Sequence, residues 1–402
     1  MSQNDRRWSW QLGLASWLAL GGAIFASLGD CALAQLKPVP DDTLGKENSV
    51  VTPINSHVDR IDGGARRGAN LFHSFREFNI DEGRGAYFTN PAGIENILSR
   101  VTGANRSNIL GKLGVLGNAN LFLINPHGII FGPNASLDVR GSFVASTANR
   151  FIFPDGNQFS ATNPEAPPLL TINVVVPIGL QFEGDEPGTI VNAGNLVVGQ
   201  DLTLAAGNLD LQGQIYAGGN LTLQAQDTVK VRDSVFSPFI AAAGGQLVVQ
   251  GNQGIDILAL NHPASGLFSV GDMVLRSTNP VGGDAHYWSG GNFRIEQLDG
   301  SLGDLFSLYD PIIRSQGDVS FFAYQGASLH ILAGGSVNIN TVVITEPDTA
   351  GDTINPTTTP ALANVTLSDG TSLVIDGSAR PTLDVRAGMK LEAIGSPLGT
   401  LG

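Results

Sequence analysis

The chain has 402 residues, with 22 Lys and Arg against 36 Asp and Glu, so its formal net charge is −14. Charged residues make up 14% of the sequence and hydrophobic residues 42%, which is too apolar for a disordered chain, and the acidic balance disfavours nucleic-acid binding. The 51 glycines are about twice the average usage and follow no G-x-y period, so collagen is excluded and turns are favoured over long helices.

The first 34 residues have the pattern of a secretory signal peptide. Arg6 and Arg7 precede an apolar stretch over residues 12–28, and the small residues of 32–34 suit cleavage before Gln35. A permanent transmembrane anchor is the weaker reading, because glycines and Asp30 interrupt the stretch near its ends. Twin-arginine export and a lipoprotein at Cys31 are further alternatives, and each of these export routes takes the protein out of the cytoplasm.

Removal of the signal also removes Cys31, the only cysteine, so the mature chain forms no disulfide bond within itself. A secreted protein without disulfides is held by its core alone, or crosses a pore in a state that a crosslink would obstruct. After residue 34 no window holds the ~18 uninterrupted apolar residues of a membrane-spanning helix. We therefore expect no transmembrane segment in the mature chain.

A repeat begins near Gly194. Seven segments share one template, in which a glycine and a polar residue precede an apolar-x-apolar strand, and their glycines are spaced 25, 26, 26, 20, 26 and 18 residues apart. The glycines that open them are Gly194, Gly219, Gly245, Gly271, Gly291, Gly317 and Gly335. Further short alternating strands lie between these marks, for example at Leu202/Leu204, Leu209/Leu211, Val229/Val231, Ile255/Ile257, Leu329/Ile331, Leu373/Ile375 and Leu383/Val385.

A period of 18 to 26 residues with two or three strands per unit predicts an all-β solenoid of the parallel β-helix type. A leucine-rich repeat fits less well, because the units lack its asparagine-centred consensus and a helical half. A propeller needs about 40 residues per blade. Because the first coil of a solenoid exposes unpaired backbone groups, residues 37–160 are the candidate for an N-terminal cap.

Two Pro-rich stretches divide the chain. Residues 163–168 separate the N-terminal half from the repeats, and the Thr/Pro-rich residues 345–362 are predicted to be a loop or linker. The expected organisation is a signal peptide over 1–34, a capped domain with the first coils over 35–160, β-helix repeats over 161–345, and a linker with further β-helix strands over 346–402.

Four segments of the N-terminal half, at residues 68–80, 94–103, 120–132 and 141–147, closely resemble the secretion domain of filamentous-haemagglutinin-type exoproteins, the passengers of two-partner secretion. The resemblance covers about residues 45 to 150. It implies a single-stranded right-handed parallel β-helix with an N-terminal cap. It also implies an unfolded periplasmic stage and a dedicated outer-membrane barrel transporter with periplasmic receptor domains as partner.

The resemblance places partner recognition in two motifs, the start of the segment 68–80 and a turn in the segment 120–132. The turn, usually Asn-Pro-Asn-Gly in the family, has a histidine in third place here, which Pro and Gly on either side accommodate. The turn either only shapes the cap or contacts the partner directly. The candidate recognition residues are Asn70, Leu71, Phe72, Asn125, Pro126, His127, Gly128 and Ile129.

The sequence gives little sign of catalysis. The six histidines, which include His57, His262 and His330, have no metal-binding spacing, and we expect no metal and no cofactor. A β-helical polysaccharide lyase or hydrolase is the enzymatic alternative, since carboxylates could line a groove. The carboxylates in question are Asp227, Asp233, Asp256, Asp272, Asp299, Asp304, Asp310 and Asp318. The aromatic residues Phe236, Phe239, Tyr287, Trp288 and Tyr309 could stack on sugars but are more simply explained by packing.

The sequence as a whole is interpreted as a secreted or cell-surface exoprotein of a Gram-negative-type bacterium, and not as an enzyme. Its β-helix is expected to be adhesive and to bind a host-cell or surface carbohydrate or protein receptor. The alternatives are the β-helical carbohydrate-active enzyme and a purely structural surface rod. The chain ends within repeat-like sequence, so one interpretation makes it the start of a longer exoprotein.

Overall fold

The computed structural model describes residues 36–165, 179–184, 187–309, 311–349, 362–366 and 370–395. The chain divides into two units, residues 1–35 and 36–402, and the description below concerns the second. The predicted signal peptide, Asp310 and most of the Thr/Pro-rich stretch lie outside the described residues.

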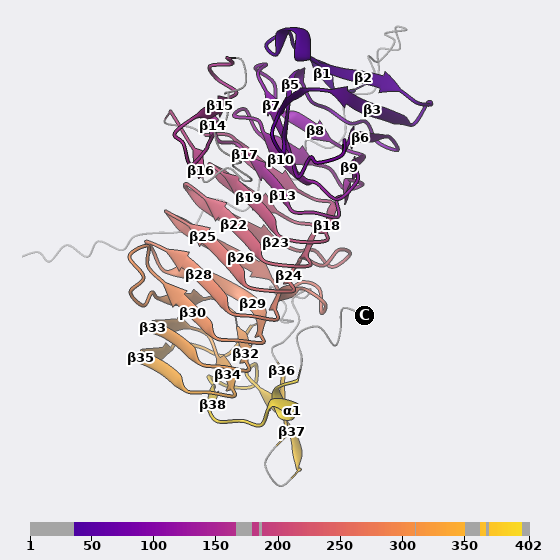
Figure 1. The fold of residues 1–402 in the computed structure, drawn as a ribbon. Coiled ribbons are helices and arrows are strands. Elements are labelled where there is room, and N and C mark those ends of the chain that lie inside the picture. The colour runs from indigo at the N-terminus through magenta and orange to yellow at the C-terminus, as the bar shows by residue number, and fades with distance from the viewer. Residues whose placement is uncertain are drawn as a thin grey trace, which may run out of the picture. The chain divides into compact units, whose positions relative to one another are not determined.

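The second unit is a parallel β-helix whose coils each contribute strands to three columns (Figure 1). The first column contains β5 (Asn70–Glu77), β7 (Asn96–Val101), β10 (Asn120–Ile124), β13 (Phe143–Ser146), β19 (Leu202–Ala206), β22 (Leu221–Ala225), β25 (Leu247–Gly251), β28 (Met273–Ser277), β30 (Phe293–Glu296), β33 (Val319–Gly326) and β35 (Val337–Ile344). Neighbouring strands of this column are parallel and in register.

The second column follows the first within each coil. It contains β8 (Ser107–Ile109), β11 (Ile129–Phe131), β17 (Thr189–Asn192), β20 (Asn208–Leu211), β23 (Thr228–Arg232), β26 (Gly254–Ala259), β29 (Val281–Ser289), β31 (Leu305–Ser307) and the later halves of β33 and β35. The long strands β33 and β35 pass from the first column into the second without a break.

The third column closes each coil. It contains β3 (Val58–Gly63), β6 (Gly85–Thr89), β9 (Lys112–Leu116), β12 (Ser136–Asp138), β18 (Asn195–Val198), β21 (Gln214–Ala217), β24 (Ile240–Ala243), β27 (Gly266–Ser269), the later half of β29, β32 (Ile312–Ser315), β34 (Leu329–Ala333) and β38 (Leu383–Arg386). The predicted fold class is confirmed.

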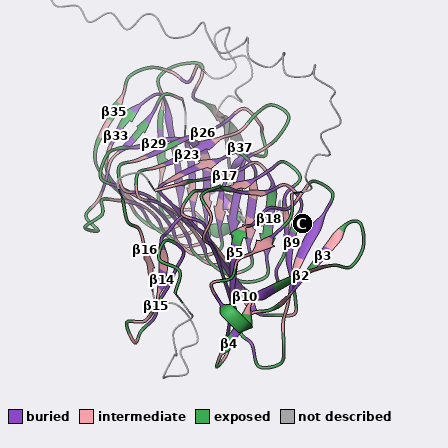
Figure 2. Ribbon diagram, turned by 90° about the horizontal axis from the view of Figure 1, so that it is seen from above, coloured by how far each residue is buried: buried purple, intermediate pink, exposed green. Residues whose placement is uncertain are grey.

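The core is a stack of apolar side chains that repeats from coil to coil. Alternate residues of each strand point inward, so Leu221, Leu247, Met273 and Phe293 lie in register in successive coils with no exposed surface. Figure 2 shows the buried residues along the interior of the stacked strands. Each such side chain contributes roughly 1.5–3 kcal/mol through burial, and it does so against neighbours from the adjacent coils.

A row of Asn, Asp and related side chains, here called the Asx row, runs along the turn that enters the first column. In the later coils the side-chain oxygen of one member accepts the backbone N–H of its equivalent in the next coil, at 2.7 to 2.9 Å. These bonds join Asp201 to Asn220, Asn220 to Gln246, Asp272 to Asn292, Asn292 to Asp318, and Asp318 to Ser336. The polar position of the sequence template is therefore a hydrogen-bond acceptor for the following coil.

The glycine of the template is explained by the same bond. A Cβ atom on Gly291 would lie 2.3 Å from Asp272 Oδ1, and one on Gly335 would lie 2.1 Å from Asp318 Oδ1. The accepting oxygen occupies the space that a side chain would need, so glycine is required before the members whose N–H groups receive this bond. These glycines are Gly219, Gly245, Gly291, Gly317 and Gly335.

The structure corrects one member of the predicted series. Gly194 precedes β18 in the third column, whereas the other six template glycines precede strands of the first column. The residue that corresponds to the other members of the row is Asp201, which directly precedes β19 of the first column. It follows Gln200 instead of a glycine.

The N-terminal cap is shorter than the stretch 37–160 from which it was expected. It consists of β1 (Val39–Pro40), the 3-10 helix η1 (Gly45–Glu47), β2 (Ser49–Pro53) and β4 (Ala65–Arg67). These strands pair antiparallel with β5 and β3, and so cover the backbone edge of the first coil. From β5 onward the N-terminal half already consists of coils.

One coil is interrupted by an excursion between β13 and β17. It carries an antiparallel sheet of β14 (Arg150–Ile152), β15 (Gln158–Ser160) and β16 (Gly179–Gln181), which lies beside the stack (Figures 1 and 2). Phe151, Phe153 and Phe159 of this excursion pack with outward-facing residues of β5, β7 and β10 in a second hydrophobic cluster. The Pro-rich break at 163–168 falls inside this excursion.

Near the end of the described residues, β36 (Leu362–Thr366) and β37 (Ser372–Asp376) form an antiparallel hairpin. The predicted strand at Leu373/Ile375 belongs to this hairpin, whereas Leu383/Val385 belongs to β38 and pairs in parallel with β34. The short helix α1 (Leu391–Ile394) follows, and Gly395 accepts a hydrogen bond from the Gln316 side chain through its carbonyl at 2.7 Å.

Substitution of Gly291 by alanine tests the Asx row. The new Cβ would displace the Asp272 carboxylate, and we expect the free energy of unfolding to fall by about 1–3 kcal/mol. Gly254→Ala is the control, because its Cβ would meet only the Thr228 side chain, at 3.5 Å or more, and a change within about 0.5 kcal/mol is expected. Equal urea midpoints for the two variants would contradict the proposed role of the glycine.

Candidate functional site

The predicted recognition turn joins β10 to β11 and is held by its own backbone. Gly128 N–H donates to Asn125 O at 3.0 Å, His127 N–H donates to Asn125 Oδ1 at 3.0 Å, and Gly128 has a φ of 113°. The Asn125 amide donates to Asn105 O and Ser107 Oγ in the preceding coil, both at 3.0 Å. Histidine therefore occupies the third position of the turn without disturbing it.

Most of this turn faces the protein interior. Asn125 and Ile129 have no exposed surface. Gly128 is also buried, and a Cβ atom added to it would lie 2.9 Å from Thr189 O of the next coil. Pro126 is half-buried, and only the His127 side chain is exposed.

The second predicted motif begins β5 and is buried throughout. The Asn70 side chain accepts a hydrogen bond from the Asn96 amide at 3.0 Å, which starts the Asx row. Leu71 points into the main core, and Phe72 points outward into the second cluster, where its ring lies 4.8 Å from that of Phe159.

The structure does not bring the two motifs together. Asn70 is in register with Asn96 and Asn120 at the start of the first column, and Asn125 lies five residues farther along the same column. Five extended residues span roughly 17 Å. The two motifs therefore lie at opposite ends of the first-column strands.

Sequence reasoning missed a buried cation between these ends. Arg100 of β7 is 1% exposed, and its guanidinium donates to Ser74 Oγ, Thr43 Oγ1, Ser160 O and Glu165 O at 2.8 to 2.9 Å. It also lies over the Phe159 ring, 4.2 Å from the centroid. Burial lowers the pKa of Arg100 to about 10, although the charge of Asp41 opposes this shift, so the group stays protonated at neutral pH.

Asp41 supplies the counter-charge from the cap. Burial acts to raise its pKa, but hydrogen bonds from Thr102, Thr43 and Ser74 outweigh burial and lower the pKa below its ordinary value. The Thr102 and Ser74 hydroxyls donate to Asp41 Oδ2 at 2.6 and 2.8 Å. Arg100 and Asp41 thus connect the cap, the first coils and the excursion through one polar network.

His73 is a second buried group without a motif in the sequence. It lies in β5 with no exposed surface, its Nδ1 is 3.0 Å from Ser49 Oγ, and its ring contacts Phe75 and Phe88. Burial lowers the pKa of His73 to about 3 and outweighs the opposing charge of Asp62, so His73 is neutral in the folded protein. In the sequence His73 stands between Phe72 and Ser74, and this pattern does not indicate that its ring is buried.

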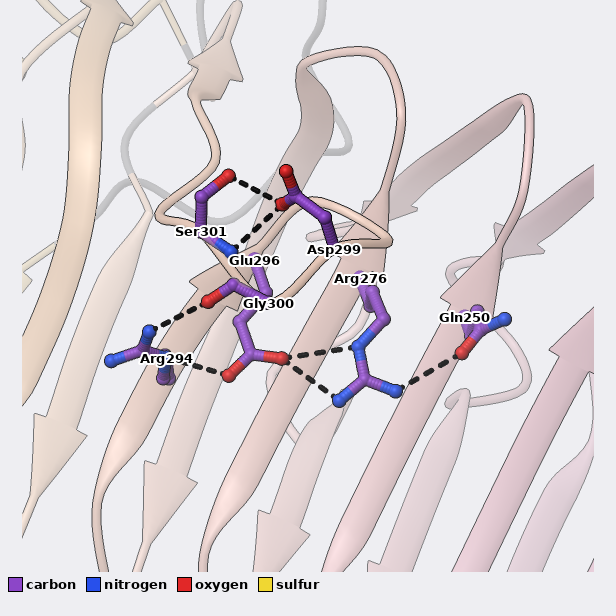
Figure 3. Close-up of polar contacts among 7 residues, drawn as sticks. All are labelled: Gln250, Arg276, Arg294, Glu296, Asp299, Gly300 and Ser301. Atoms are coloured by element: carbon purple, nitrogen blue, oxygen red, sulfur yellow. Dashed lines mark hydrogen bonds and ion pairs between the residues drawn. The ribbon is translucent and has the colours of Figure 1, made fainter.

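Four of the carboxylates considered for the enzymatic alternative have clear structural partners. Asp272 and Asp318 belong to the Asx row, and Asp233 accepts hydrogen bonds from Asn261, His262 and Ser265 of the next coil. Asp299 accepts the hydroxyl and backbone N–H of Ser301, and these bonds lower its pKa (Figure 3).

Figure 3 also shows Glu296 between Arg276 and Arg294, in hydrogen-bonded ion pairs of 2.6 to 3.0 Å. Burial raises the pKa of Asp284, but this carboxylate lies in β29 with Oδ1 occupied by Ser307 Oγ and Tyr309 N–H. These environments hold carboxylates in fixed hydrogen bonds within and between coils.

The aromatic residues considered for sugar stacking differ in their exposure. Phe239 and Tyr287 lie in the core, Phe236 is 91% exposed, and Trp288 is half-buried beside Arg314. Among the described residues, no three His, Cys, Asp or Glu side chains gather as a metal-binding group. No helix in the part of the chain that the structure describes is long and apolar enough to cross a membrane.

Comparison with known proteins identifies the family. A model described as the TPS secretion domain, where TPS denotes two-partner secretion, matches residues 36–295. Two similar solved structures are the HMW1 secretion domain from Haemophilus influenzae (TM-score 0.40, 16% identity, 77% of this chain and 84% of that one) and a filamentous hemagglutinin secretion domain (TM-score 0.38, 17% identity, 77% and 100%). No curated protein matches the chain.

The chain belongs to the family of two-partner secretion domains, since the family model covers well over half of it. It therefore carries the secretion domain of an exoprotein, which a Gram-negative bacterium secretes with the help of a partner transporter in the outer membrane. The family is a family of secretion domains and not one of enzymes.

Replacement of Arg100 by leucine tests the polar network. The change removes the cation that faces Asp41 and its hydrogen bonds to acceptors in three segments, so we expect the free energy of unfolding to fall by about 2–5 kcal/mol. Arg76→Leu is a matched control, because Arg76 is exposed on the same β5 strand that supplies Ser74. Urea unfolding of the purified protein distinguishes the two variants, and similar midpoints would argue against the network.

The neutral state of His73 predicts a dependence of stability on pH. Its folded-state pKa of about 3 lies below the ordinary 6.5, so the unfolded chain binds the extra proton and stability is lost as pH falls from 6.5 towards 3. The expected slope from His73 is about 1.4 kcal/mol per pH unit within this window. His73→Gln should remove this slope, whereas replacement of the exposed His127 by Gln should leave it. Equal slopes in urea titrations of the two variants would contradict the prediction.

Proposed function

We propose that the outer-membrane transporter binds the eight candidate recognition residues while the chain is still unfolded. Six of them, Asn70, Leu71, Phe72, Asn125, Gly128 and Ile129, are buried in the folded coils, and a receptor could reach their side chains only before folding. This burial is the observation that carries the proposal. It favours extended-chain recognition by the receptor domains of the transporter over docking of a folded domain.

Coil-by-coil folding outside the cell then gives export its direction. Each new strand pairs with the strand of the coil that has already emerged, and its inward side chains join a core that is already formed. Every completed coil therefore opposes movement of the chain back into the pore. The absence of cysteine after residue 34 suits passage of an extended chain.

The network at Arg100 supports a delay in folding until enough chain has emerged. Its partners Thr43 and Glu165 are separated by most of the N-terminal half, and a buried cation without its acceptors is costly. The cap and first coils reach full stability only after the excursion has been released. Inside the periplasm this dependence would help to keep residues 70–72 and 125–129 accessible.

The function proposed for the secreted β-helix is adhesion at the cell surface or at a host receptor. Its columns present outward-facing rows of polar side chains, such as Gln224, Gln250, Arg276 and Glu296, which are in register in successive coils. Such rows offer a regular surface for a protein or carbohydrate receptor. The division of the chain at residue 160 into a recognition part and an adhesive part belongs to this proposal.

A serine substitution at Ile129 tests recognition separately from folding. Ile129→Ser changes a recognition residue, and Ile331→Ser places the same defect at an equally buried core position outside residues 36–295. In a Gram-negative host with the partner transporter, we expect secretion to fall at least tenfold for Ile129→Ser and less than threefold for Ile331→Ser.

Binding measurements complete this test. The receptor domains of the transporter should bind the urea-unfolded chain after dilution, and should bind the prefolded chain at least tenfold more weakly. Equal loss of secretion by the two serine variants, or tight binding of the prefolded chain, would contradict recognition of the unfolded motif.

A further inference from the structure

A groove of about 520 Å³ lies on the outer face of the third column in the first coils. Its lining includes Tyr87, Lys112 and Ser136 from β6, β9 and β12, together with Glu82 and Asn134 from the loops that lead into these strands. A groove of this size is within the range that holds small organic ligands. Neither the recognition residues nor the Arg100 network line it.

Tyr87 forms the platform of the groove. Its ring lies flat across two glycines: a Cβ on Gly85 would be 2.9 Å from one edge of the ring, and a Cβ on Gly114 would be 2.5 Å from the other. The backbone on which the ring rests thus has no side chains at these two points. The ring is half-buried and contributes to the groove lining, so it offers an aromatic surface to a ligand.

The Tyr87 ring is also fixed in place. Its hydroxyl faces Asp138, in the strand two coils farther on, and burial together with this carboxylate raises the pKa of Tyr87. The loop beside it is held by Arg84, which is 9% exposed and forms an ion pair of 2.7 Å with the buried Asp59. Because the Tyr87 ring and the Arg84 loop are ordered before binding, the entropy cost of ordering the site when a ligand binds is reduced.

The rim of the groove carries both hydrogen-bond donors and acceptors. Lys112 and Glu82 are exposed and opposite in charge, Asn134 donates to Glu82 Oε1, and Ser136 adds a hydroxyl. The two exposed charges cancel, which suits a neutral ligand. The ligand must therefore have one apolar face for the ring and hydroxyl groups around its edge.

We infer that this groove binds a neutral pyranose unit of a glycan. A pyranose presents a face of C–H groups that packs on an aromatic ring, and its equatorial hydroxyls exchange hydrogen bonds with carboxylate, amide, ammonium and hydroxyl groups such as those of the rim. The secretion domain would then contribute a glycan contact of its own to the adhesive role proposed above. The inference depends on that role only for its biological meaning, because the binding itself is a property of the folded protein.

Saturation-transfer NMR on the folded, purified protein tests the inference. The probes are the methyl pyranosides of glucose, galactose and mannose at millimolar concentration, with methyl glucuronide as an acidic comparison. At least one neutral probe should receive saturation from the wild-type protein. Tyr87→Ala should weaken its binding at least tenfold, and Tyr87→Trp should retain it.

Tyr216→Ala is the matched control, since Tyr216 is another half-buried tyrosine on the outer face of the third column, in β21. It should leave binding unchanged, whereas Lys112→Ala and Glu82→Gln at exposed rim positions should each weaken binding several-fold without altering thermal unfolding. The inference fails if no neutral probe receives saturation, if only the glucuronide binds, or if Tyr87→Ala and Tyr216→Ala behave alike. The secretion assay of Ile129→Ser is independent of these results, so failure of the export proposal is recognised separately.

Discussion

Each strand of this β-helix depends on the next coil for its backbone hydrogen bonds, and this dependence determines most of the structure. A coil without a neighbour exposes a full edge of N–H and C=O groups. At the N-terminal side β1, β2 and β4 cover that edge with antiparallel strands. Along the stack the Asx row adds side-chain bonds to the backbone ladder, which fixes both the glycine and the polar residue of the repeat.

The same dependence connects folding with export. Six of the residues proposed to identify the chain to its transporter are buried once their coils close, so under this proposal the chain presents different side chains before and after folding. Ile129 illustrates this: the side chain proposed to be read by a receptor is the one that later packs without exposed surface. Under this proposal, recognition and folding use the same apolar residues at different times.

The sequence predicted the parts of the fold that repeat. The strands at Leu209/Leu211 and Val229/Val231 were predictable because alternation and a regular period reflect the geometry of a coil. Gly194 was counted in one series with the other six glycines because third-column turns can have the same Gly-polar-apolar pattern.

Arg100 and Tyr87 could not be predicted as parts of sites, since their partners lie up to 65 residues away in sequence and are brought near only by stacking. The recognition motifs were predicted through resemblance and that role stays a prediction, whereas their burial is visible only in the structure. Long-range polar contacts of this kind leave no periodic signal in the chain.

The excursion between β13 and β17 also has a practical meaning for protein engineering. The chain leaves the stack after Ser146 and returns at Thr189, and the Thr147 hydroxyl donates to Gly188 O at 2.9 Å, so the two ends of the inserted segment meet. The strands above and below continue in register across it. This corner accommodates a segment of some forty residues without loss of the solenoid, and it is the natural position at which to graft a foreign epitope for display.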